Sequence, residues 1–358
     1  MMRSIFKILA SLVLASVMML SIFSCKPADA EENDSETETK AETETETETV
    51  TETETETETD TEESEEKEEN VKYEELDLKV MSFNIRYQTD GDKGVRNWSN
   101  RRDAVAAFIA SSGVDVICMQ EVMPVQFDDL QAALSDKYEL LFFGSNGAGT
   151  QANVIGFDKT KWMLKDSDIF WLSETPDVPS KGWGASHYRI CCTATIVHRE
   201  TYAEMRVFNV HLDHKESTEA ARVNGIGLVL DRIALSDTPA YLCGDFNCDT
   251  SSDAYKNAAA VMNDSMARSP VTESGITYQN WGGSGQVLLD YNMFSKDDFE
   301  LLSFDIREDK WGENNENYLS DHYAIESCVK MRYIPIERPD INGAYGTDGN
   351  GDDYTQRY

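Results

Sequence analysis

The sequence predicts an α+β fold, a four-layer α/β/β/α sandwich of two mixed β-sheets flanked by helices. Two observations predict it. Helical and strand-like patterns alternate in the earlier part of the globular region, residues 71–336, whereas strands dominate its later part. Such a mixture is typical of two packed sheets with helices outside them. In addition, several apolar strand-like runs end in polar side chains, which is where sheets with helical connections build binding sites.

The predicted strands are short runs rich in apolar, β-branched and aromatic residues, bounded by turn residues. In chain order they are residues 76–85, 114–119, 138–143, 153–157, 190–198, 206–211, 240–245, 288–294 and 324–332. A turn at Glu200 separates the fifth strand from the sixth, which predicts that these two strands pair.

Helices are predicted where apolar residues recur on one face, over residues 98–110, 124–134 and 216–235. Ser99 is the expected N-cap of the first helix, and Gly113 is expected to end it. Pro124 suits the first turn of the second helix, because a proline there lacks only an N–H that would have no partner.

Composition divides the chain into four parts. We expect a lipoprotein signal peptide over residues 1–25, a disordered Thr/Glu-rich tether over 26–72, one globular domain over 73–336 and a flexible Gly/Asp/Asn-rich tail over 337–358. The tether cannot bury apolar surface, and its like charges repel and extend it. The globular part is long enough for one domain with a large core.

The first 25 residues have the pattern of an export signal. Arg3 and Lys7 form a basic start, and residues 8–23 are apolar. This run is shorter than the roughly 20 residues that a membrane span needs. The phrase Ile22-Phe23-Ser24-Cys25 resembles the lipobox of bacterial lipoproteins, in which the cysteine is lipidated and becomes the mature N-terminus.

This resemblance implies an exported lipoprotein of the cell envelope or cell surface, held at the membrane by a lipid on Cys25. The alternative is an ordinary signal peptide that is cleaved near Ala28 or Ala30, which would give a secreted protein. No second subunit is expected, so we predict a monomer.

Net charge bears on the class of partner. The chain carries −34 in all, of which residues 31–70, with 20 acids and 2 lysines, account for −18. Residues 1–30 contribute +2, so the remainder of the chain carries −18. Proteins that grip long nucleic acids normally present a basic face. An acidic domain therefore disfavours nucleic acid as the partner, although one local basic patch would be compatible with it.

Five short phrases carry the chemistry. Four of them are apolar strand-like runs that end in groups able to hold a metal or a phosphate, and the fifth is a polar group nearer the end of the chain. The phrases are Val80-Met81-Ser82-Phe83-Asn84, Val116-Ile117-Cys118-Met119-Gln120-Glu121, Val207-Phe208-Asn209-Val210-His211, Cys243-Gly244-Asp245-Phe246-Asn247 and Ser320-Asp321-His322. In the fourth phrase, Asp245 and Asn247 lie two residues apart on an extended segment and so point the same way.

Taken in this order, and with Asp290, the phrases resemble the endonuclease/exonuclease/phosphatase superfamily over roughly residues 77–332. A narrower likeness, carried by Phe170-Trp171-Leu172-Ser173-Glu174-Thr175-Pro176 and Asn209-Val210-His211-Leu212-Asp213-His214, is to exported bacterial hydrolases of this fold, whose substrates are mostly unassigned. The resemblance thus implies a chemistry more firmly than a substrate.

The residues suit hydrolysis of a phosphate ester. Asp245 can accept a proton from an attacking water, and Asn247 can donate to the phosphate. His211 and His322 can donate to phosphoryl oxygens or transfer protons. The resemblance implies that Asp290 holds the His322 ring in one tautomer. We therefore expect these five residues to be catalytic.

A hard divalent cation with oxygen ligands would neutralise the phosphoryl charge, and we expect Mg²⁺ or Mn²⁺. Glu121 is the expected direct ligand. Asn84 is expected to orient the metal or to bind the phosphate, and Asp321 to complete the metal shell. Substrate contacts are expected from Asn84 and from the three residues that lie where relatives place such groups, His187, Arg189 and His214.

The predicted function is that of a metal-dependent phosphoesterase that uses direct attack of water on a phosphodiester or phosphomonoester, with a small or lipid phosphate as substrate. One alternative is a secreted endonuclease or exonuclease. The other is a binding module that has lost catalysis, but none of the expected catalytic residues is missing.

Overall fold

The computed structural model describes residues 72–269 and 275–335. The expected signal peptide with Cys25, the tail, and nearly all of the expected tether lie outside these residues. Within them, no helix is both long and apolar enough to cross a membrane.

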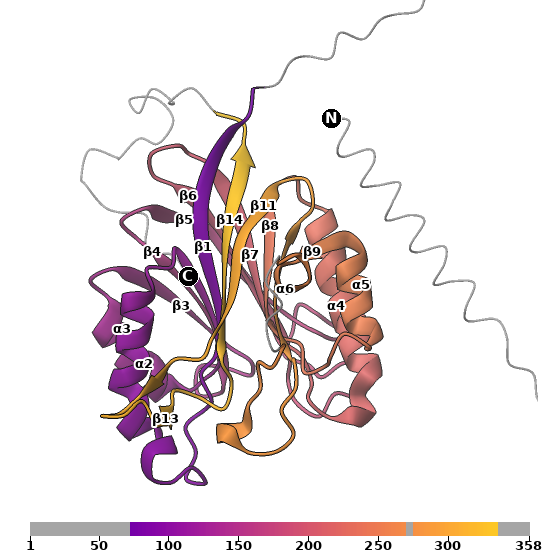
Figure 1. The fold of residues 1–358 in the computed structure, drawn as a ribbon. Coiled ribbons are helices and arrows are strands. Elements are labelled where there is room, and N and C mark those ends of the chain that lie inside the picture. The colour runs from indigo at the N-terminus through magenta and orange to yellow at the C-terminus, as the bar shows by residue number, and fades with distance from the viewer. Residues whose placement is uncertain (1–71, 270–274, 336–358) are drawn as a thin grey trace, which may run out of the picture. The chain divides into compact units, whose positions relative to one another are not determined.

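Two six-stranded mixed sheets form the centre of the domain (Figure 1). In spatial order, the first contains β11 (Phe299–Arg307), β14 (Ala324–Tyr333), β1 (Glu74–Asn84), β2 (Val116–Val122), β4 (Ala152–Asp158) and β3 (Tyr138–Gly144). The second contains β5 (Trp162–Trp171), β6 (Ile190–His198), β7 (Glu204–His211), β8 (Ala240–Asp245), β10 (Asp290–Ser295) and β9 (Met262–Asp264).

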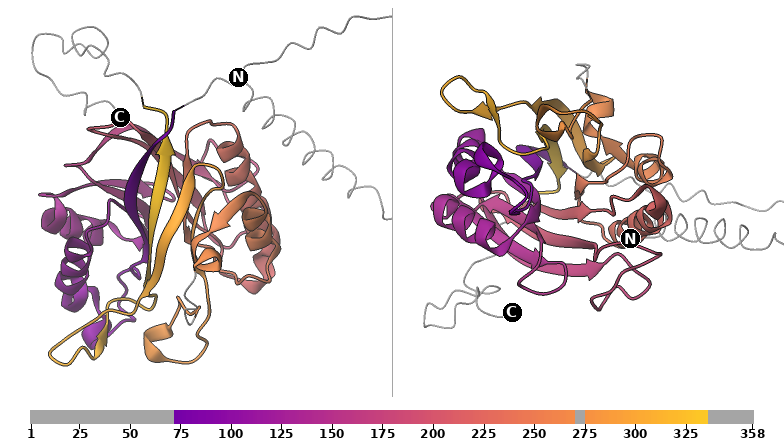
Figure 2. Two further views of the ribbon diagram at one scale, coloured as in Figure 1. Left: turned by 45° about the horizontal axis from the view of Figure 1, so that its top comes forward. Right: turned by 90° about the horizontal axis from the view of Figure 1, so that it is seen from below.

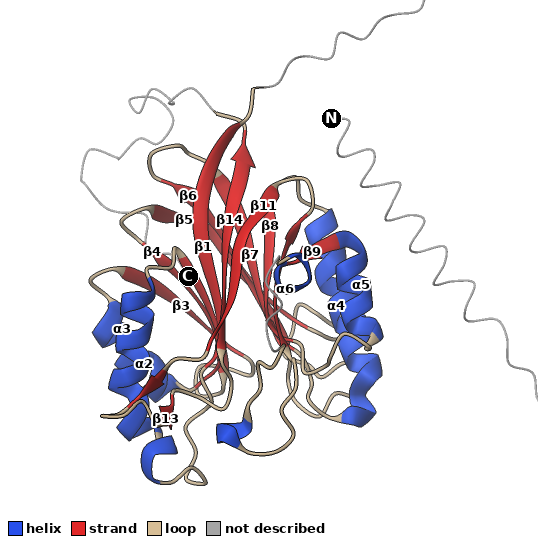
Figure 3. Cartoon of the chain, in the orientation of Figure 1, coloured by secondary structure: helices blue, strands red, loops and turns tan. Residues whose placement is uncertain are grey.

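Helices lie on the outer sides of the two sheets, with the strands between them (Figures 2 and 3). The helices α2 (Trp98–Ser112) and α3 (Pro124–Leu134) pack with the first sheet in one apolar cluster. The helices α4 (Glu219–Ala234) and α5 (Asp253–Val261) pack with the second sheet in another. This arrangement confirms the predicted four-layer sandwich.

The core between the sheets follows from the alternation of side chains along each strand. Val80 and Ile155 of the first sheet and Val207 and Cys243 of the second belong to one buried cluster. The opposite faces of the same strands meet the helices, as Met81 does in the cluster around α2. Because both faces of these strands are covered, they have almost continuous apolar sequences, as expected for buried strands.

Helix ends agree with the sequence in part. The predicted cap Ser99 is wrong by two residues: Asn97 is the N-cap of α2, and its side chain accepts the Ser99 backbone N–H. Gly113 ends the helix as predicted, at φ 69°. The predicted helix at 216–235 begins later, because the short 3₁₀ helix η2 (Glu216–Thr218) precedes α4.

Several elements have no counterpart among the predictions. They are β5, α5, β9, β11, the short helix α6 (Ser265–Arg268), the 3₁₀ helices η1 (Gly94–Arg96) and η3 (Asn280–Gly282), and the pair β12 (Lys310–Trp311) and β13 (Asn317–Tyr318). Both β5 and β11 are edge strands with exposed polar residues, so neither has the apolar run on which the prediction depended.

Candidate active site

Strand pairing brings the predicted site residues to one edge of the sandwich. The strands β1 and β2 run parallel with Asn84 beside Gln120, the residue before Glu121. In the second sheet, β7 and β8 run parallel with His211 beside Asp245. The strand β10 is antiparallel to β8 and begins with Asp290 opposite Asp245. The strands β7, β8 and β10 thus place His211, Asp245 and Asp290 side by side at this edge.

Asp245 lies at the centre of this group and is only 1% exposed. Its Oδ2 accepts a hydrogen bond from Asn84 Nδ2 at 3.0 Å. His211 Nε2 and His322 Nε2 lie 3.6 and 3.8 Å from the same oxygen. Its Oδ1 accepts the backbone N–H of Asn247 at 2.9 Å. The carboxylate is therefore fixed between two imidazoles, and the two sheets are joined by the Asn84–Asp245 hydrogen bond.

Behind this carboxylate lies a buried acid–imidazole pair. His322 Nδ1 lies 2.8 Å from Asp290 Oδ2, as the resemblance implied. Burial by itself lowers the pKa of His322, but the charges of Asp290, Asp245 and Asp321 outweigh it and raise the pKa to about 10. At neutral pH the ring is therefore an imidazolium, with Nε2–H turned toward Asp245.

The pKa of Asp245 is raised to about 7, first by burial and then by the charge of Asp290, while His322 partly offsets both. The other imidazole has the opposite shift: burial, and then the charge of Arg189, lower the pKa of His211 well below its usual value. The site thus combines a carboxylate that titrates near neutrality, one charged imidazole and one neutral imidazole. Titratable groups whose surroundings shift their pKa values in opposite directions are typical of acid–base sites.

Glu121, at the end of β2 in the first sheet, and Asp321 form a second group of carboxylates in the site. Burial, and then the charge of Asp321, raise the pKa of Glu121. Glu121 Oε2 accepts the Tyr87 backbone N–H at 3.0 Å, and Asp321 Oδ2 lies 3.4 Å from Arg86 NH1. Two carboxylates that repel each other, with Asn84 close by, are oxygen donors of the kind that Mg²⁺ or Mn²⁺ prefers. The expected metal ligands therefore fit a hard divalent cation.

Geometry also identifies a metal-like cluster at the centre of the site. The ligand atoms of Asp245, Asp290 and His322 all lie within 4.8 Å of one another, and all three residues are buried. Here, however, the Nδ1 atom of His322 and Asp290 Oδ2 already bond each other. The carboxylates of Glu121 and Asp321 are the better candidates, because the nearby charges of His322 and Arg86 offset their mutual repulsion only in part.

The backbone at this edge is strained where side chains must point inward. Glu121 and Asn247 have φ of 63° and 50°, left-handed values that are uncommon for residues with a Cβ. Such strain is typical of functional sites, where the surrounding structure enforces it. Gly244, before Asp245, has φ 149°, and a Cβ there would overlap the carbonyl oxygen of Val210. Only glycine therefore allows β8 to approach β7 this closely.

Two of the predicted donors are engaged inside the protein. Asn247 Nδ2 donates to the Leu212 carbonyl at 3.0 Å, which leaves its second amide hydrogen for a ligand. Asn84 uses Nδ2 on Asp245, and its Oδ1 accepts the Arg86 backbone N–H at 3.0 Å. Both residues thus hold the Asp245 carboxylate in place, Asn84 through its side chain and Asn247 through its backbone N–H.

The predicted substrate-binding residues form a neighbouring cluster. The His187 and His214 rings lie 5.0 Å apart, and Arg189 NH2 lies 3.5 Å from His214 Nδ1. Between them Asp213 accepts from several donors, including the His187 backbone N–H, and these hydrogen bonds outweigh its burial and lower its pKa. Both imidazoles are exposed, whereas Arg189 is buried. The structure thus brings all three predicted residues together beside His211.

Sequence reasoning missed two arginines that shape the site. Arg86 pairs with Asp92 at 3.2 Å as well as with Asp321. Arg101 of α2 is fully buried and donates to the carbonyls of Ile85, Arg86 and Leu319, so it ties the end of β1 to the loop that carries His322. A charged residue in the first turn of a helix carries no signal of this role in the sequence.

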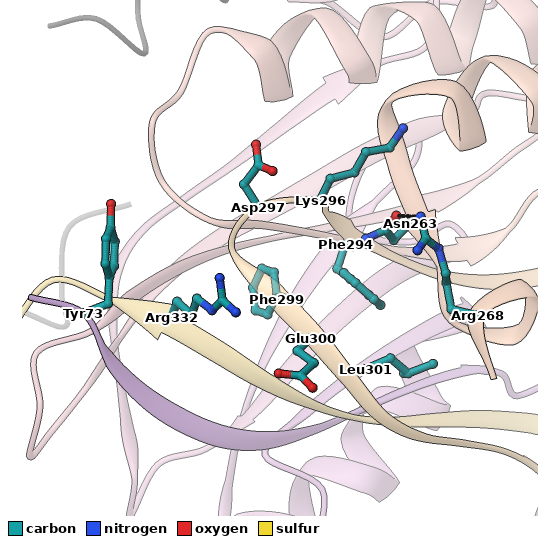
Figure 4. Close-up of a pocket in the computed structure, with 10 residues that line it drawn as sticks. All are labelled: Tyr73, Asn263, Arg268, Phe294, Lys296, Asp297, Phe299, Glu300, Leu301 and Arg332. Atoms are coloured by element: carbon teal, nitrogen blue, oxygen red, sulfur yellow. Dashed lines mark hydrogen bonds between the residues drawn. The ribbon is translucent and has the colours of Figure 1, made fainter. Parts of the chain in front are cut away.

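A larger cavity lies away from these residues (Figure 4). Its volume is about 600 Å³, and it is lined mainly by residues of β10, β11 and the segment between them. Its lining includes Arg268, Lys296 and Arg332 but none of the predicted site residues. Size alone therefore does not locate the candidate active site.

The fold and this edge define a class: a phosphoester hydrolase built on a two-sheet sandwich, with a buried Asp/His cluster. The sequence model of the Endonuclease/Exonuclease/phosphatase family matches residues 81–322, and the chain belongs to that family. Divalent metals are typical of the family, in agreement with the carboxylates described above.

Solved structures resemble the chain throughout the domain. An endonuclease/exonuclease/phosphatase from Bacteroides vulgatus is 29% identical with a TM-score of 0.66, over 72% of this chain and 99% of that one. A mannosyl-6-phosphatase from Bacteroides thetaiotaomicron is 27% identical with a TM-score of 0.65, over 70% of this chain and 99% of that one. Nocturnin of Drosophila melanogaster is 27% identical over 202 residues, which are 50% of this chain and 30% of Nocturnin.

Proposed function

We propose that this protein is an exported, divalent-metal-dependent phosphoesterase that hydrolyses a phosphodiester or a phosphomonoester of a small molecule or lipid by direct attack of water. One observation carries the proposal. Asn84 holds Asp245 between the imidazoles of His211 and His322, and Asp290 in turn holds the His322 ring.

Asp245 is the proposed general base. A pKa near 7 lets the carboxylate be ionised in part of the population at neutral pH and still be basic enough to accept a proton from water. Asn247, two residues on, is proposed to donate its free amide hydrogen to the phosphoryl group. No serine or cysteine belongs to this set of groups, so we expect no covalent intermediate.

The two imidazoles are proposed to have different roles. His322 is charged at neutral pH and can donate from Nε2 to a phosphoryl oxygen or to the leaving oxygen. Asp290 keeps the ring in the orientation that this donation requires. His211 is neutral, so its Nε2 can donate a hydrogen bond without adding charge beside Asp245.

Glu121, Asn84 and Asp321 are the proposed ligands of Mg²⁺ or Mn²⁺. When bound, such a cation would neutralise phosphoryl charge that develops during the reaction. Without it, the two carboxylates repel a phosphate, and the charges of His322 and Arg86 offset theirs only in part. The metal requirement therefore follows from the charges of this chain's own residues.

The substrate is proposed to be a small or lipid phosphate, bound in part by His187, Arg189 and His214. The similarity to a mannosyl-6-phosphatase supports a small phosphate ester. The acidic charge of the domain disfavours a long nucleic acid, since such ligands need a basic surface. A nuclease and a binding module without catalysis are the competing functions.

A panel of substrates tests this proposal. The purified protein with Mg²⁺ is offered sugar phosphates, inositol phosphates, sphingomyelin and single- and double-stranded DNA and RNA, and release of product is followed. We expect turnover of at least one small or lipid phosphate. Turnover of nucleic acid alone would establish the nuclease, and binding without turnover of any ester would establish the binding module.

Export is the remaining part of the proposal. It is supported by the basic start, the apolar run and Cys25, all of which precede the described residues. A lipid on Cys25 would join the domain to a membrane through the Thr/Glu-rich segment. The catalytic domain would then meet substrates outside the cytoplasm.

A further inference from the structure

A small niche opens beside the proposed metal ligand and the neutral imidazole. Glu121, His211 and Arg189 line it, together with Asn153, Tyr188 and Ile190. Its volume is about 20 Å³. Roughly 10–15 Å³ is enough for one water molecule, so the niche is large enough for one oxygen-sized group.

The guanidinium of Arg189 is a positive charge that forms no ion pair with a carboxylate of the described residues. The residue is 9% exposed, and its Nε has no hydrogen-bond acceptor. The single hydrogen bond that its side chain forms among the described residues is the 3.5 Å contact from NH2 to His214 Nδ1, and no carboxylate of those residues forms an ion pair with it. Its backbone is fixed, because Leu172 N–H donates to the Arg189 carbonyl at 2.8 Å.

A buried, unpaired guanidinium is costly unless an anion satisfies it. Burial lowers the pKa of Arg189, and the charges of Asp213, Asp245 and Glu121 offset this only in part. Arginine binds phosphate oxygens through strong charge-assisted hydrogen bonds. The missing partner is therefore best supplied by the ligand.

The anion that enters the niche is the phosphoryl group under attack, because the niche shares Glu121 and His211 with the proposed site. A phosphomonoester has three non-bridging oxygens and carries nearly two negative charges at neutral pH, since its second pKa is about 6. A diester has one charge and a second carbon substituent. Both esters have a non-bridging oxygen that fits, but only the monoester carries the extra charge that pairs with Arg189.

We propose that the niche receives one non-bridging oxygen of a phosphomonoester and that Arg189 neutralises its second charge, so that the enzyme prefers monoesters to diesters. This inference rests on the proposed function and narrows its substrate class. Arg189 is here a specificity-determining residue that contacts the substrate.

The test compares two esters with the same leaving group, p-nitrophenyl phosphate and ethyl p-nitrophenyl phosphate, at saturating Mg²⁺. For the wild type we expect kcat/KM to be at least about tenfold higher for the monoester. Arg189→Met should lower the monoester value by about a hundredfold, the cost of leaving a buried charge unpaired, and change the diester value by less than about threefold. Arg189→Lys should restore part of the preference.

Arg206→Met is the matched control. Arg206 also has a buried Nε without a partner, but it pairs in register with Ala240 at the other end of the β7–β8 pair from His211 and Asp245. This variant should leave the ratio of the two kcat/KM values unchanged. Arg189→Met removes a buried charge, so its thermal midpoint should be no lower than that of the wild type. If it does not fold, Arg189→Lys and phosphate binding carry the test.

Binding gives a readout that is independent of turnover. Inorganic phosphate should raise the thermal midpoint of the wild type more than dimethyl phosphate does, and the difference should vanish in Arg189→Met. A wild type that prefers the diester, or an equal loss for both esters in Arg189→Met, would overturn the inference while leaving the proposed function intact. No metal-dependent hydrolysis of either ester, nor of the wider panel, would instead contradict the proposed function.

Discussion

Asp245 lies in contact with three other candidate catalytic residues, His211, His322 and Asn247. Its side chain is therefore the most informative one to change. We expect Asp245→Ala and His322→Ala each to lower kcat by at least about a hundredfold, the scale of acid–base groups. The measurement is turnover of the best substrate in the panel. His198→Gln is the control, because His198 contacts Thr201 at the end of β6, away from the site. Full activity of Asp245→Ala would remove the proposed base.

The raised pKa of Asp245 also predicts a pH-dependent stability. The folded pKa of about 7 exceeds the usual 3.8, so the folded state binds more protons between these values and wild-type stability falls as pH rises from about 4 to 7. In metal-free protein, Asp245→Asn should melt higher than the wild type at pH 7, by about 2–4 °C for each kcal/mol gained. The difference should disappear near pH 4. A lower melting temperature for Asp245→Asn at pH 7 would show that the carboxylate is not destabilised.

At the scale of elements, the sequence was most informative where local signals mark both ends of an element. The ranges predicted for β6, α3 and β8 agree with the structure residue for residue, because apolar runs, a proline start and polar ends mark them. The edge strands β5 and β11 were not predicted, since solvent allows polar residues at alternate and adjacent positions along them.

In the candidate site, too, the sequence predicted what has a local signal and missed what depends on tertiary packing. Residues at strand ends could be predicted because apolar runs lead directly into them, as with Glu121, His211 and Asp245. Their pairing across the two sheets, such as Asn84 with Asp245, depends on how the sheets pack and has no local signal. Arg86 and Arg101 were missed for the same reason: their partners are far away in sequence or are backbone carbonyls.

Arg101 is the connection between α2 and the site. Arg101→Met leaves the carbonyls of Ile85 and Leu319 without this donor, whereas the Arg86 carbonyl keeps the hydrogen bond from Gln126 Nε2. We therefore expect a loss of about 1–3 kcal/mol of stability for each buried group left unsatisfied, and a lower kcat. Thermal unfolding and turnover measure both. Arg102→Met is the control, because Arg102 is the exposed neighbour on the same helix. Equal behaviour of the two variants would mean that Arg101 does not fix the site.

At the scale of the whole molecule, the lipid anchor that we propose would determine where the enzyme acts. The segment from Cys25 to Val71 reaches at most about 150–165 Å, at roughly 3.3–3.6 Å per residue. Cys25→Ala should release the protein from the membrane fraction without changing the turnover of a soluble substrate. Fractionation followed by mass spectrometry of the N-terminus checks this. A freely soluble wild type with unmodified Cys25, or one cut near Ala28 or Ala30, would show a plain signal peptide instead.

Dependence of turnover on a divalent cation tests the central claim most directly, because the proposed chemistry needs a cation that Glu121 and Asp321 would help to hold. Hydrolysis of the best substrate by the full chain is measured after chelation and during titration with Mg²⁺ and Mn²⁺, for the wild type and for Glu121→Gln. We predict that chelation abolishes turnover, that either metal restores it, and that Glu121→Gln needs at least about tenfold more metal. Undiminished hydrolysis by the chelated wild type would contradict the claim.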